Sequence, residues 1–402
     1  MLSTQEALQA VLSAARPIRE SESLNTLEAN GRVLAEDIVS PLDVPPMSNS
    51  AVDGYAVRHA DLHGAETVLP VSQRVPAGHQ PEPLEPGTAA RVFTGAPIPA
   101  GADTSIMQEQ CEARGDEVVI RHQPQIGEWI TRQGADIQAG SVILPAGTRL
   151  SPQALGLAAS VGCARVPVTR RLRVAVFFTG DELVMPGEPL RPGSIYNSSR
   201  FTLRGLLENL GCALTDFGIV PDRLDTTRAT LRQAAREHDL IITVGGVSVG
   251  EEDHIKPAVQ AEGRLNLWQI ALKPGKPLAF GEVDNGTTRP AYFMGLPGNP
   301  VSSLVTFLLF VRPFILRLQG VERVTPRRFA MRADFTQKKA DRRNEFLRAR
   351  LNEDGGLSLF ANQSSAVLTS TVWGDGLIDN PPNHAIQAGE NVQFIPFAEL
   401  LY

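Results

Sequence analysis

Acidic residues follow three predicted strands in the second half of the chain. Glu182, Asp222 and Asp253 each stand a few residues after a short apolar run typical of a buried strand. Because the carboxyl ends of parallel strands meet at one edge of a sheet, we expect these carboxylates to lie close together. A hard divalent cation such as Mg²⁺, which takes oxygen ligands and bridges to phosphates, would relieve their mutual repulsion. At any single position, ordinary capping of a helix N-terminus is the alternative. Further acids stand beside them at Asp181, Glu251 and Glu252.

Two lysines lie in a loop that is stiffened by proline. Lys273 and Lys276 belong to the segment LKPGKP, in which prolines and a glycine restrict the backbone. A stiff loop places a charged side chain at little entropic cost, which suits the binding of an anion. A solvated lysine is the alternative at either position.

Glycine-rich turns next to apolar runs predict a ligand cradle. Gly245 and Gly246 end the run 240–244, and glycine there permits a sharp turn or a close approach of the backbone to a ligand. Pro297 and Asn299 follow another apolar run, with Asn299 suited to cap a helix that begins at Pro300. Backbone N–H groups in the first turn of that helix could receive an anion. Together these loops predict a site for an anionic small molecule.

An alternation of strands and helices begins at Leu172 and predicts the element that positions these loops. The expected strands are 173–180, 213–220 and 240–244, and the expected helices are 199–211, 225–237 and 300–318. That order predicts parallel strands with right-handed crossovers, in a doubly wound α/β domain that spans 171–320.

The rest of the chain predicts a multidomain protein of α/β and β class. Helices are expected at 3–15, 24–35 (broken at Gly31) and 151–166 (capped by Ser151). Between the second and third, short apolar runs separated by Pro and Gly predict a β-rich domain. Because helical pieces flank it, we interpret 43–139 as an insertion into a mixed N-terminal domain made of 1–42 and 140–170. The β pattern of 321–402 predicts a C-terminal β-barrel, with a sandwich as the alternative.

Composition limits the classes of function. The net charge of −6 over 402 residues does not favour a nucleic-acid binder. Three widely spaced cysteines support neither a disulfide framework nor a zinc cluster. The N-terminus lacks the pattern of a secretory signal, and the apolar run 304–311 is too short to span a bilayer. We therefore expect a cytoplasmic protein that binds neither nucleic acid nor membrane.

Long motifs in a fixed order resemble a known family. They are PPMSNSAVDGYAV, RVFTGAPIPAGADTSIMQEQ, RQGADI, FFTGDELV, GSIYNSS, ITVGGVSVGEEDHIK, LKPGKPLAFG and GLPGNPVSS, and they extend from about residue 45 to 305. In this order they resemble the MoeA family of molybdopterin molybdenumtransferases, whose eukaryotic relative is the gephyrin E domain.

The resemblance implies the last step of molybdenum cofactor assembly. In that step adenylylated molybdopterin and molybdate give the molybdenum cofactor and AMP, in a Mg²⁺-dependent reaction. The resemblance also implies an elongated homodimer of four-domain subunits, with a molybdopterin-binding α/β domain and a site between protomers. Partners would be the molybdopterin adenylyltransferase and downstream molybdoenzymes or their chaperones. Molybdate and tungstate remain alternative oxyanions.

The family's functional residues carry over to matching positions. The implied catalytic acids are Asp53, Asp136, Glu182, Asp222 and Asp253, of which the last three could also hold the metal. The implied substrate contacts are Thr94, Ser248, Lys273, Lys276, Arg348 and Ser365, the last two being linked to molybdate. One departure is Gln269 after Trp268, where family members often carry a lysine. Without that charge, Lys273 alone would suffice or affinity for the anion would fall.

Two other functions compete with this interpretation. The preceding enzyme, molybdopterin adenylyltransferase, has a domain that resembles 172–318, but it consumes ATP and would not need the flanking domains. A non-catalytic scaffold, a role that the gephyrin relative also serves, would not need to retain all five acids.

Overall fold

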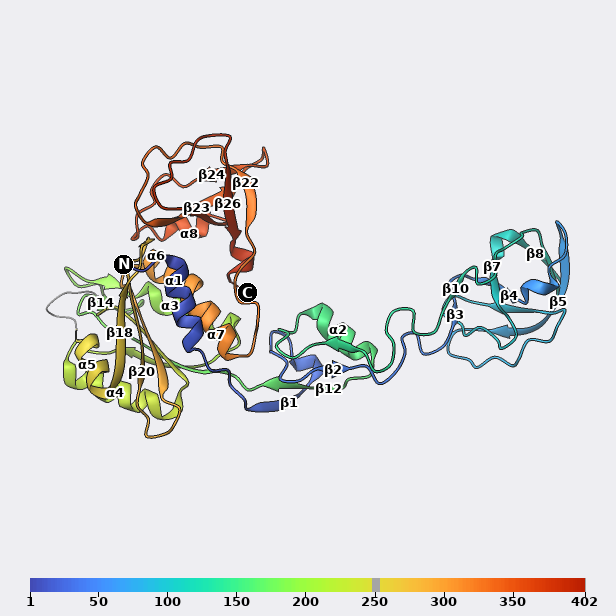
Figure 1. Ribbon diagram of the computed structural model, residues 1–402, viewed down its shortest axis with the longest axis horizontal. Helices are drawn as coiled ribbons and strands as arrows, with labels where there is room; N and C mark the ends of the chain where they lie inside the picture. The colour runs from blue at the N-terminus through green and yellow to red at the C-terminus, as the bar shows by residue number, and fades with distance from the viewer. Residues whose placement is uncertain (248–253, 402) are drawn as a thin grey trace.

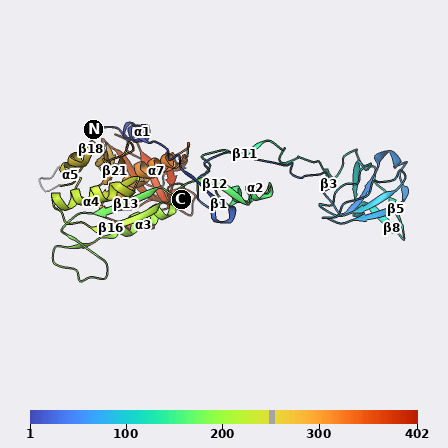
Figure 2. The same ribbon diagram turned by 90° about the horizontal axis from the view of Figure 1, so that it is seen from below.

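The computed structural model describes residues 1–247 and 254–401 and shows an elongated molecule (Figure 1). An α/β domain and a C-terminal β domain lie together at one end, and a β-rich domain lies at the other. A thin middle domain connects them, and the turned view shows the same separation (Figure 2). The multidomain α/β and β architecture is therefore confirmed.

The α/β domain is built on one six-stranded sheet. Its order is β16 (Ala213–Ile219), β13 (Arg173–Phe178), β17 (Leu240–Val244), β21 (Ala291–Leu296), β20 (Pro277–Val283) and β18 (Gly263–Gln269). The first four strands run parallel, and β20 runs antiparallel to both of its neighbours, β21 and β18. Helices cover both faces of the sheet: α3 (Ser198–Asn209) lies on one, and α4 (Leu224–Glu237) and α5 (Ile255–Glu262) lie on the other. Because both faces are covered, every residue of β17 is buried, which explains its continuous apolar sequence.

A long helix closes the α/β domain. It consists of α6 (Pro300–Thr306), a π-helical stretch η4 (Phe307–Val311) and α7 (Arg312–Leu318). Pro313 has no N–H to donate to the preceding turn, and a π-helical stretch accommodates that loss. By length and composition this 19-residue helix could cross a membrane, but 94% of its apolar stretch is buried inside the protein. It is the core helix of the domain.

The N-terminal helix belongs to the same core. Helix α1 (Thr4–Ala14) begins with a capping box at Ser3, and its Ala7 and Val11 pack into the α/β core. Leu2 also pairs with Ile270 next to β18. Our expectation groups residues 1–42 with 140–170, whereas α1 packs on the α/β domain.

The helix expected at 24–35 is wrong. This segment holds β1 (Ser21–Asn25) and a short 3₁₀ turn, η1 (Thr26–Glu28). Strand β1 pairs antiparallel with β12 (Arg165–Thr169) over five residues, and this long-range pairing overrides a weak local helical pattern. The expected helix at 151–166 does form as α2 (Pro152–Ser160), capped by Ser151 as predicted, and ends earlier because β12 follows.

The chain leaves and re-enters the middle domain through paired strands. Strand β2 (Ile38–Val39) on the way out pairs with β11 (Val142–Leu144) on the way back. Farther out, β3 (Asn49–Ser50) pairs with β10 (Ile130–Thr131). The β-rich domain is thus held at the end of a two-stranded connection.

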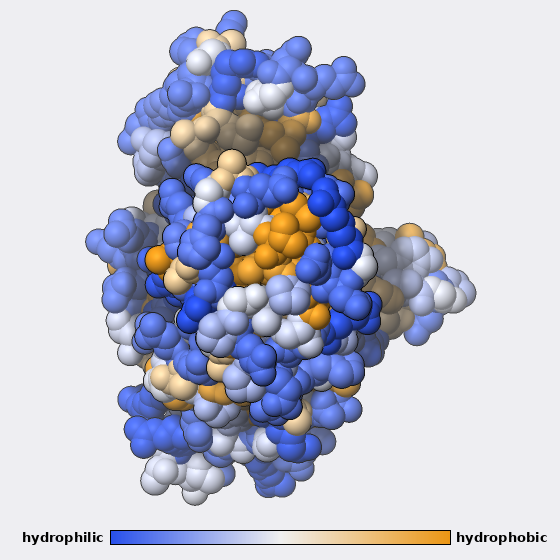
Figure 3. All heavy atoms as spheres, turned by 90° about the vertical axis from the view of Figure 1, so that its right-hand side faces the viewer, coloured by the Kyte–Doolittle hydropathy of each residue, from blue (hydrophilic) through white to orange (hydrophobic). Residues whose placement is uncertain are grey.

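The β-rich domain is a six-stranded sheet with a small core on each face. Its order is β7 (Thr104–Met107), β4 (Gly54–Val57), β6 (Ala89–Val92), β5 (Thr67–Val75), β9 (Glu117–Ile120) and β8 (Cys111–Arg114). Seen from this end, the surface is mostly hydrophilic and frames a hydrophobic patch (Figure 3). Shallow cores of this kind leave some apolar side chains in contact with solvent, as at Val68, which is 47% exposed.

The C-terminal domain is a closed sheet that includes a strand from the α/β domain. The strand order is β19 (Leu272–Lys273), β23 (Asn344–Leu351), β25 (Gly376–Asn380), β26 (Asn391–Pro396) and β22 (Phe329–Arg332), and β24 (Leu357–Leu359) also pairs with β23. A bridge between Ala333 and Leu357 brings β22 to β24, which closes the expected barrel. Strand β19 pairs with β23 in parallel, so the two domains share a sheet edge.

Candidate functional site

A cleft of about 730 Å³ lies between the α/β domain and the C-terminal domain. It opens at the carboxyl ends of the parallel strands, where open α/β sheets bind ligands. It is lined by predicted site residues from several loops, namely Glu182, Asp222, Gly245, Gly246, Lys273, Lys276, Pro297, Asn299 and Ser365. Residues that were not predicted also line it, namely Thr179, Ser302, Arg343, Gln363 and Ser364.

The turn after β17 forms the floor of this cleft. Gly245 and Gly246 have φ values of +96° and +65°, which side chains rarely adopt. A Cβ atom on Gly245 would lie 2.4 Å from the carbonyl oxygen of Thr179, and one on Gly246 would lie 2.6 Å from Ile255. The turn therefore requires glycine. The buried Oγ1 of Thr179 has no hydrogen-bond partner within residues 1–247 and 254–401, so a polar group is available beside the turn.

Two carboxylates face this cleft from neighbouring strands. Glu182 follows β13 and Asp222 follows β16, which is next to β13 in the sheet. The carboxylate of Glu182 lies over the Cα of Gly180 and forms no ion pair with any described residue. No group of three Asp, Glu, His or Cys side chains within the described part of the chain is arranged to hold a metal. Asp253 and Ser248 lie outside the described residues.

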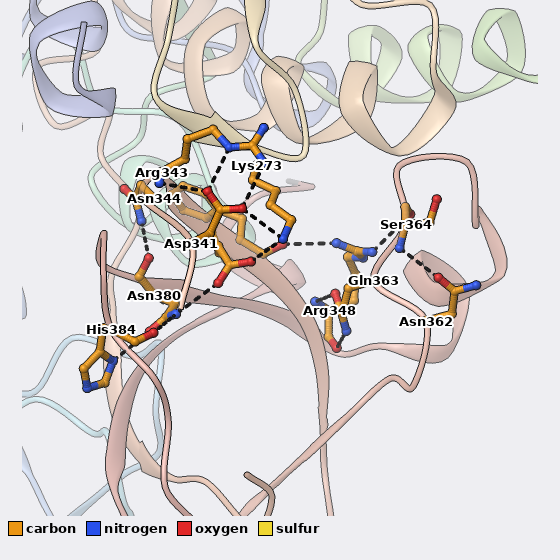
Figure 4. A network of polar contacts seen from close by, with 12 residues as sticks. Lys273, Asp341, Arg343, Asn344, Arg348, Asn362, Gln363, Ser364, Asn380 and His384 are labelled. Atoms are coloured by element: carbon orange, nitrogen blue, oxygen red, sulfur yellow. Dashed lines mark hydrogen bonds and ion pairs between the residues drawn. The ribbon is translucent and has the colours of Figure 1, made fainter. Parts of the chain in front are cut away.

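Lys273 is held by two carboxylates of the C-terminal domain (Figure 4). Its Nζ lies 2.8 Å from Oε1 of Glu345 and 3.2 Å from Oδ2 of Asp341. Partial burial disfavours the charge of Lys273, but the hydrogen bonds to Glu345 and Asp341 outweigh it and raise the pKa of the lysine. The Glu345 side chain is only 1% exposed, and Asn380 donates to its other oxygen at 3.4 Å. We call Lys273, Asp341, Arg343 and Glu345 the charge clamp.

Arg343 is the second cation of the charge clamp. Its Nε and Nη2 each lie 3.0 Å from an oxygen of Asp341, in a bidentate pair. The hydrogen bonds from Arg343 hold the pKa of Asp341 far below its usual range, although burial opposes the shift. Lys276, by contrast, forms no ion pair with the described residues. Of the described residues, three cations (Lys273, Lys276, Arg343) and two carboxylates (Glu182, Asp222) line the cleft. Asp341 and Glu345 lie outside this lining and pair with Lys273 and Arg343.

Arg348 does not line the cleft but supports its wall. Its side chain is completely buried, and burial lowers the pKa of the guanidinium to about 10. It donates to Ser370 at 3.0 Å and to the carbonyl oxygen of Ser364 at 3.3 Å. Gln363 donates to the Arg348 carbonyl at 3.0 Å. Arg348 therefore fixes the loop that carries Ser365, and Arg343 is the arginine that reaches the cleft.

Pro297, Asn299 and Ser302 also line the cleft, next to this loop. Asn299 stands at the N-cap of α6, with Pro300 in the first turn as predicted, but its side chain makes no capping hydrogen bond. The backbone N–H of Val301 donates to the carbonyl oxygen of Ser365 at 3.0 Å. This bond is a second link between the two domains across the cleft.

Three predicted site residues lie far from the cleft, toward the β-rich end of the molecule (Figure 1). The backbone N–H and the hydroxyl of Thr94 donate to Oδ1 of Asp53 at 2.8 and 2.9 Å. Both bonds, the backbone one first, lower the pKa of Asp53. Asp136 is exposed on the returning connection, where its N–H donates to Val44 at 2.9 Å. Within one chain, these residues do not meet Glu182 and Asp222.

The unpredicted residues carried weak sequence signals. Arg343 follows another arginine just before a predicted strand, and Gln363 stands in a polar loop between two strands. Their approach to the cleft depends on how the C-terminal barrel docks, which no local pattern encodes.

Comparisons with known proteins cover nearly the whole chain. Residues 2–162 match the MoeA N-terminal region (domain I and II), 175–317 match a probable molybdopterin binding domain, and 330–397 match the MoeA C-terminal region (domain IV). The chain is 40% identical to a molybdopterin molybdenumtransferase of Haemophilus influenzae, with 100% of both sequences covered. It is 37% identical to molybdopterin molybdenumtransferase 2 of Mycobacterium tuberculosis, with 97% of both covered. A crystal structure of a MoeA protein from Pyrococcus horikoshii superposes with a TM-score of 0.85 at 29% identity, covering 98% of this chain and all of that one.

Proposed function

Because the chain belongs to the MoeA family, we propose that its cleft is the place where molybdenum is inserted into molybdopterin. The protein is a transferase of molybdenum cofactor biosynthesis that acts on molybdopterin and molybdate. The observation that carries the proposal is the cleft itself, where carboxylates, lysines and a glycine turn from separate loops line one cavity. The finer reaction is the conversion of adenylylated molybdopterin and molybdate to the cofactor with release of AMP.

The balance of charge in the cleft supports a divalent cation. Two of the three cations in the cleft are already paired with Asp341 and Glu345, and Glu182 and Asp222 add negative charge, yet both proposed substrates are anions. Glu182 and Asp222, from adjacent strands, supply the hard oxygen ligands that Mg²⁺ prefers. Asp253 is a further candidate from the sequence. When bound, Mg²⁺ would neutralise phosphate charge at the bond between pterin and AMP.

The opposite wall of the cleft supplies donors for the molybdate dianion. Lys276 is not engaged by a carboxylate in the described structure, and Arg343 keeps its Nη1 for a ligand beyond its bidentate pair. Lys273 uses two N–H groups in the charge clamp and keeps a third. Ser364 and Ser365 add polar groups on the same wall. The dithiolene sulfurs come with the pterin, so no protein cysteine is required.

A homodimer would bring the distant residues to the cleft. Asp53 and Thr94 lie at the far end of the same chain, so a second copy is needed to present them to the carboxylates of the first. The adenylyltransferase would supply the nucleotide-linked pterin, and molybdoenzymes or their chaperones would receive the product. The three free cysteines suit a cytoplasmic location for these exchanges.

The direct test is AMP release from adenylylated molybdopterin. We expect release that requires both molybdate and Mg²⁺, and a product that activates an apo-molybdoenzyme. The parallel reaction supplies ATP and molybdopterin. Turnover only in the parallel reaction would assign the preceding adenylyltransferase step, and silence in both would favour a scaffold.

The composite site has its own test. Asp53→Ala and Asp222→Ala subunits are co-expressed with different affinity tags and purified as a mixed dimer. If the β-rich domain of one subunit completes the cleft of the other, one of the two sites is intact, and about half of native activity returns. A mixed dimer as inactive as its parents would contradict this arrangement.

A further inference from the structure

The β-rich domain is acidic, yet it carries two arginines side by side. Residues 43–139 contain 13 Asp and Glu, six Arg and no Lys, which gives a net charge of −7. Three of those arginines, Arg58, Arg114 and Arg121, form ion pairs with nearby carboxylates. Arg74 and Arg91 form none with the described residues. In an acidic domain, two unpaired neighbouring arginines are an unusual placement of charge.

Strand register puts these two arginines directly opposite each other. Arg74 of β5 is the partner of Arg91 of β6 in a parallel pair. On the other side of β6, Arg91 is the partner of Tyr55 of β4. Like charges directly opposite on neighbouring strands destabilise a sheet. The arrangement therefore calls for something that offsets the repulsion.

Aromatic rings contact both guanidinium groups and hold them in place. The Cζ atoms of Arg74 and Arg91 lie 4.6 and 4.9 Å from the centre of the Phe93 ring, and Arg91 lies 5.1 Å from that of Tyr55. We call Arg74, Phe93, Arg91 and Tyr55 the arginine ladder. Arg91 also donates to the carbonyl oxygen of Gly54 at 3.2 Å and to Gln108 at 2.6 Å. Arg74 has no hydrogen bond to the described residues, so its donors are directed to solvent.

The ladder adjoins the pair that the proposed dimer brings to the cleft. Thr94 follows Phe93 in sequence, and Asp53 precedes the Gly54 carbonyl that accepts from Arg91. Arg91 also contributes to the lowered pKa of Asp53, after the two bonds from Thr94. The ladder and the Asp53–Thr94 pair therefore form one continuous surface.

We propose that Arg74 and Arg91 bind a phosphate group of the nucleotide-linked pterin when this surface meets the cleft of a second subunit. The proposal rests on the proposed function and its dimer. Two of the three cations that line the cleft are already paired with Asp341 and Glu345, so further positive charge for the phosphates would come from elsewhere. Two guanidinium groups fixed by aromatic stacking offer fork-shaped donors for phosphate oxygens at little entropic cost.

The first test compares exposed arginines of one domain. Arg74→Gln is expected to raise the KM for adenylylated molybdopterin about tenfold and to leave the KM for molybdate unchanged, as for loss of one charge-assisted contact. Arg74→Lys keeps the charge but loses the fork-shaped donors of arginine. Its KM for adenylylated molybdopterin should lie between those of native protein and Arg74→Gln. Arg114→Gln, which changes the domain charge equally, should behave as native. If Arg74→Gln matches Arg114→Gln, the ladder does not bind substrate.

The mixed dimer tests the placement of the ladder. In a dimer with one intact composite site, Arg74→Gln on the Asp222→Ala subunit should raise the KM. The same change on the Asp53→Ala subunit should have no effect, because that ladder faces the inactive cleft. Equal effects from both subunits would contradict the proposal and indicate a structural role for Arg74.

Binding without turnover separates this proposal from the proposed function. Titration of native protein with AMP should show saturable binding that Arg74→Gln weakens about tenfold and that inorganic phosphate displaces. If the native protein binds AMP in this way but shows no turnover, only the assignment as an insertase would be overturned. If the native protein turns over and AMP binds equally well to Arg74→Gln and native protein, only the proposal for the arginine ladder would be overturned.

Discussion

The arginine ladder, Asp53 and Thr94 together form what we call the Asp53 surface of the β-rich domain. The cleft and the Asp53 surface hold their charges in opposite ways. In the cleft, Lys273 and Arg343 are clamped by Glu345 and Asp341, so cations and carboxylates nearly cancel. On the Asp53 surface, Arg74 and Arg91 form no ion pair with the described residues and are held by aromatic rings. The comparison teaches that two separate regions of the protein can together bind one anionic substrate. One part is the cleft, where we propose that metal and oxyanion bind, and the other is the arginine ladder, which would be supplied by the second subunit of the proposed dimer.

The largest effect is expected from a carboxylate of the cleft. Asp222→Asn should lower AMP release about a hundredfold at fixed Mg²⁺, and excess Mg²⁺ should restore part of it, because a metal ligand is weakened. The measurement is a Mg²⁺ titration of the release rate. Asp225→Asn, at the exposed start of α4, removes a carboxylate nearby and should leave the titration unchanged. A loss that no Mg²⁺ concentration reverses would argue against metal binding by Asp222.

The charge clamp is expected to contribute to stability as well as to activity. Glu345→Gln leaves Lys273 without its buried partner, and we expect a loss of about 1–3 kcal/mol in the free energy of unfolding. This range is reduced from that of a fully buried pair because solvent reaches Lys273, which is 35% exposed. Urea unfolding measures it, and Glu353→Gln on the exposed turn serves as the control. The KM for molybdate should rise, while the KM for adenylylated molybdopterin should not. Equal changes in both KM values would mean that the cleft and the Asp53 surface do not act on different substrates.

The clamp also gives a pH dependence of defined sign. The folded protein lowers the pKa of Asp341, so its contribution is complete above the unfolded value of about 4 and is lost as pH falls through the lower folded value. The difference in unfolding free energy between native protein and Asp341→Asn should therefore be constant from about pH 7 to 5 and shrink below about pH 4. We expect about 1 kcal/mol at neutral pH, measured by urea unfolding at each pH. A difference that grows toward acid would contradict the clamp.

The smallest effect is expected on the Asp53 surface. Thr94→Val removes the hydroxyl that donates to Asp53 but keeps the backbone N–H bond. We expect a threefold to tenfold rise in the KM for adenylylated molybdopterin, about the effect of one hydrogen bond. Thr94→Ser should restore native values. A change confined to the KM for molybdate would place Thr94 with the cleft instead.

Local pattern was enough to predict several of the α/β residues that line the cleft. Glu182 and Asp222 stand in loops whose positions follow from strand order, because parallel strands end at one edge of the sheet. The turn at Gly245 was equally predictable, since its glycines follow a buried strand.

Features set by long-range pairing could not be predicted in this way. The approach of Arg343 to the cleft depends on docking of the barrel, and the opposition of Arg74 to Arg91 depends on strand register. The expected helix at 24–35 failed for the same reason, because pairing with β12 decides the conformation of that segment.

Strand β19 has a mechanical consequence for substrate entry. It belongs by sequence to the α/β domain and by hydrogen bonding to the C-terminal barrel, where Lys273 is the register partner of Glu345. On the other wall, the bond from Val301 to Ser365 fastens the same two domains. A hinge motion that opened the cleft would have to break backbone hydrogen bonds at both of these links. The two links therefore hold the cleft at a fixed width, so that substrates would enter from its open rim. In the proposed dimer, the second subunit would cover that rim.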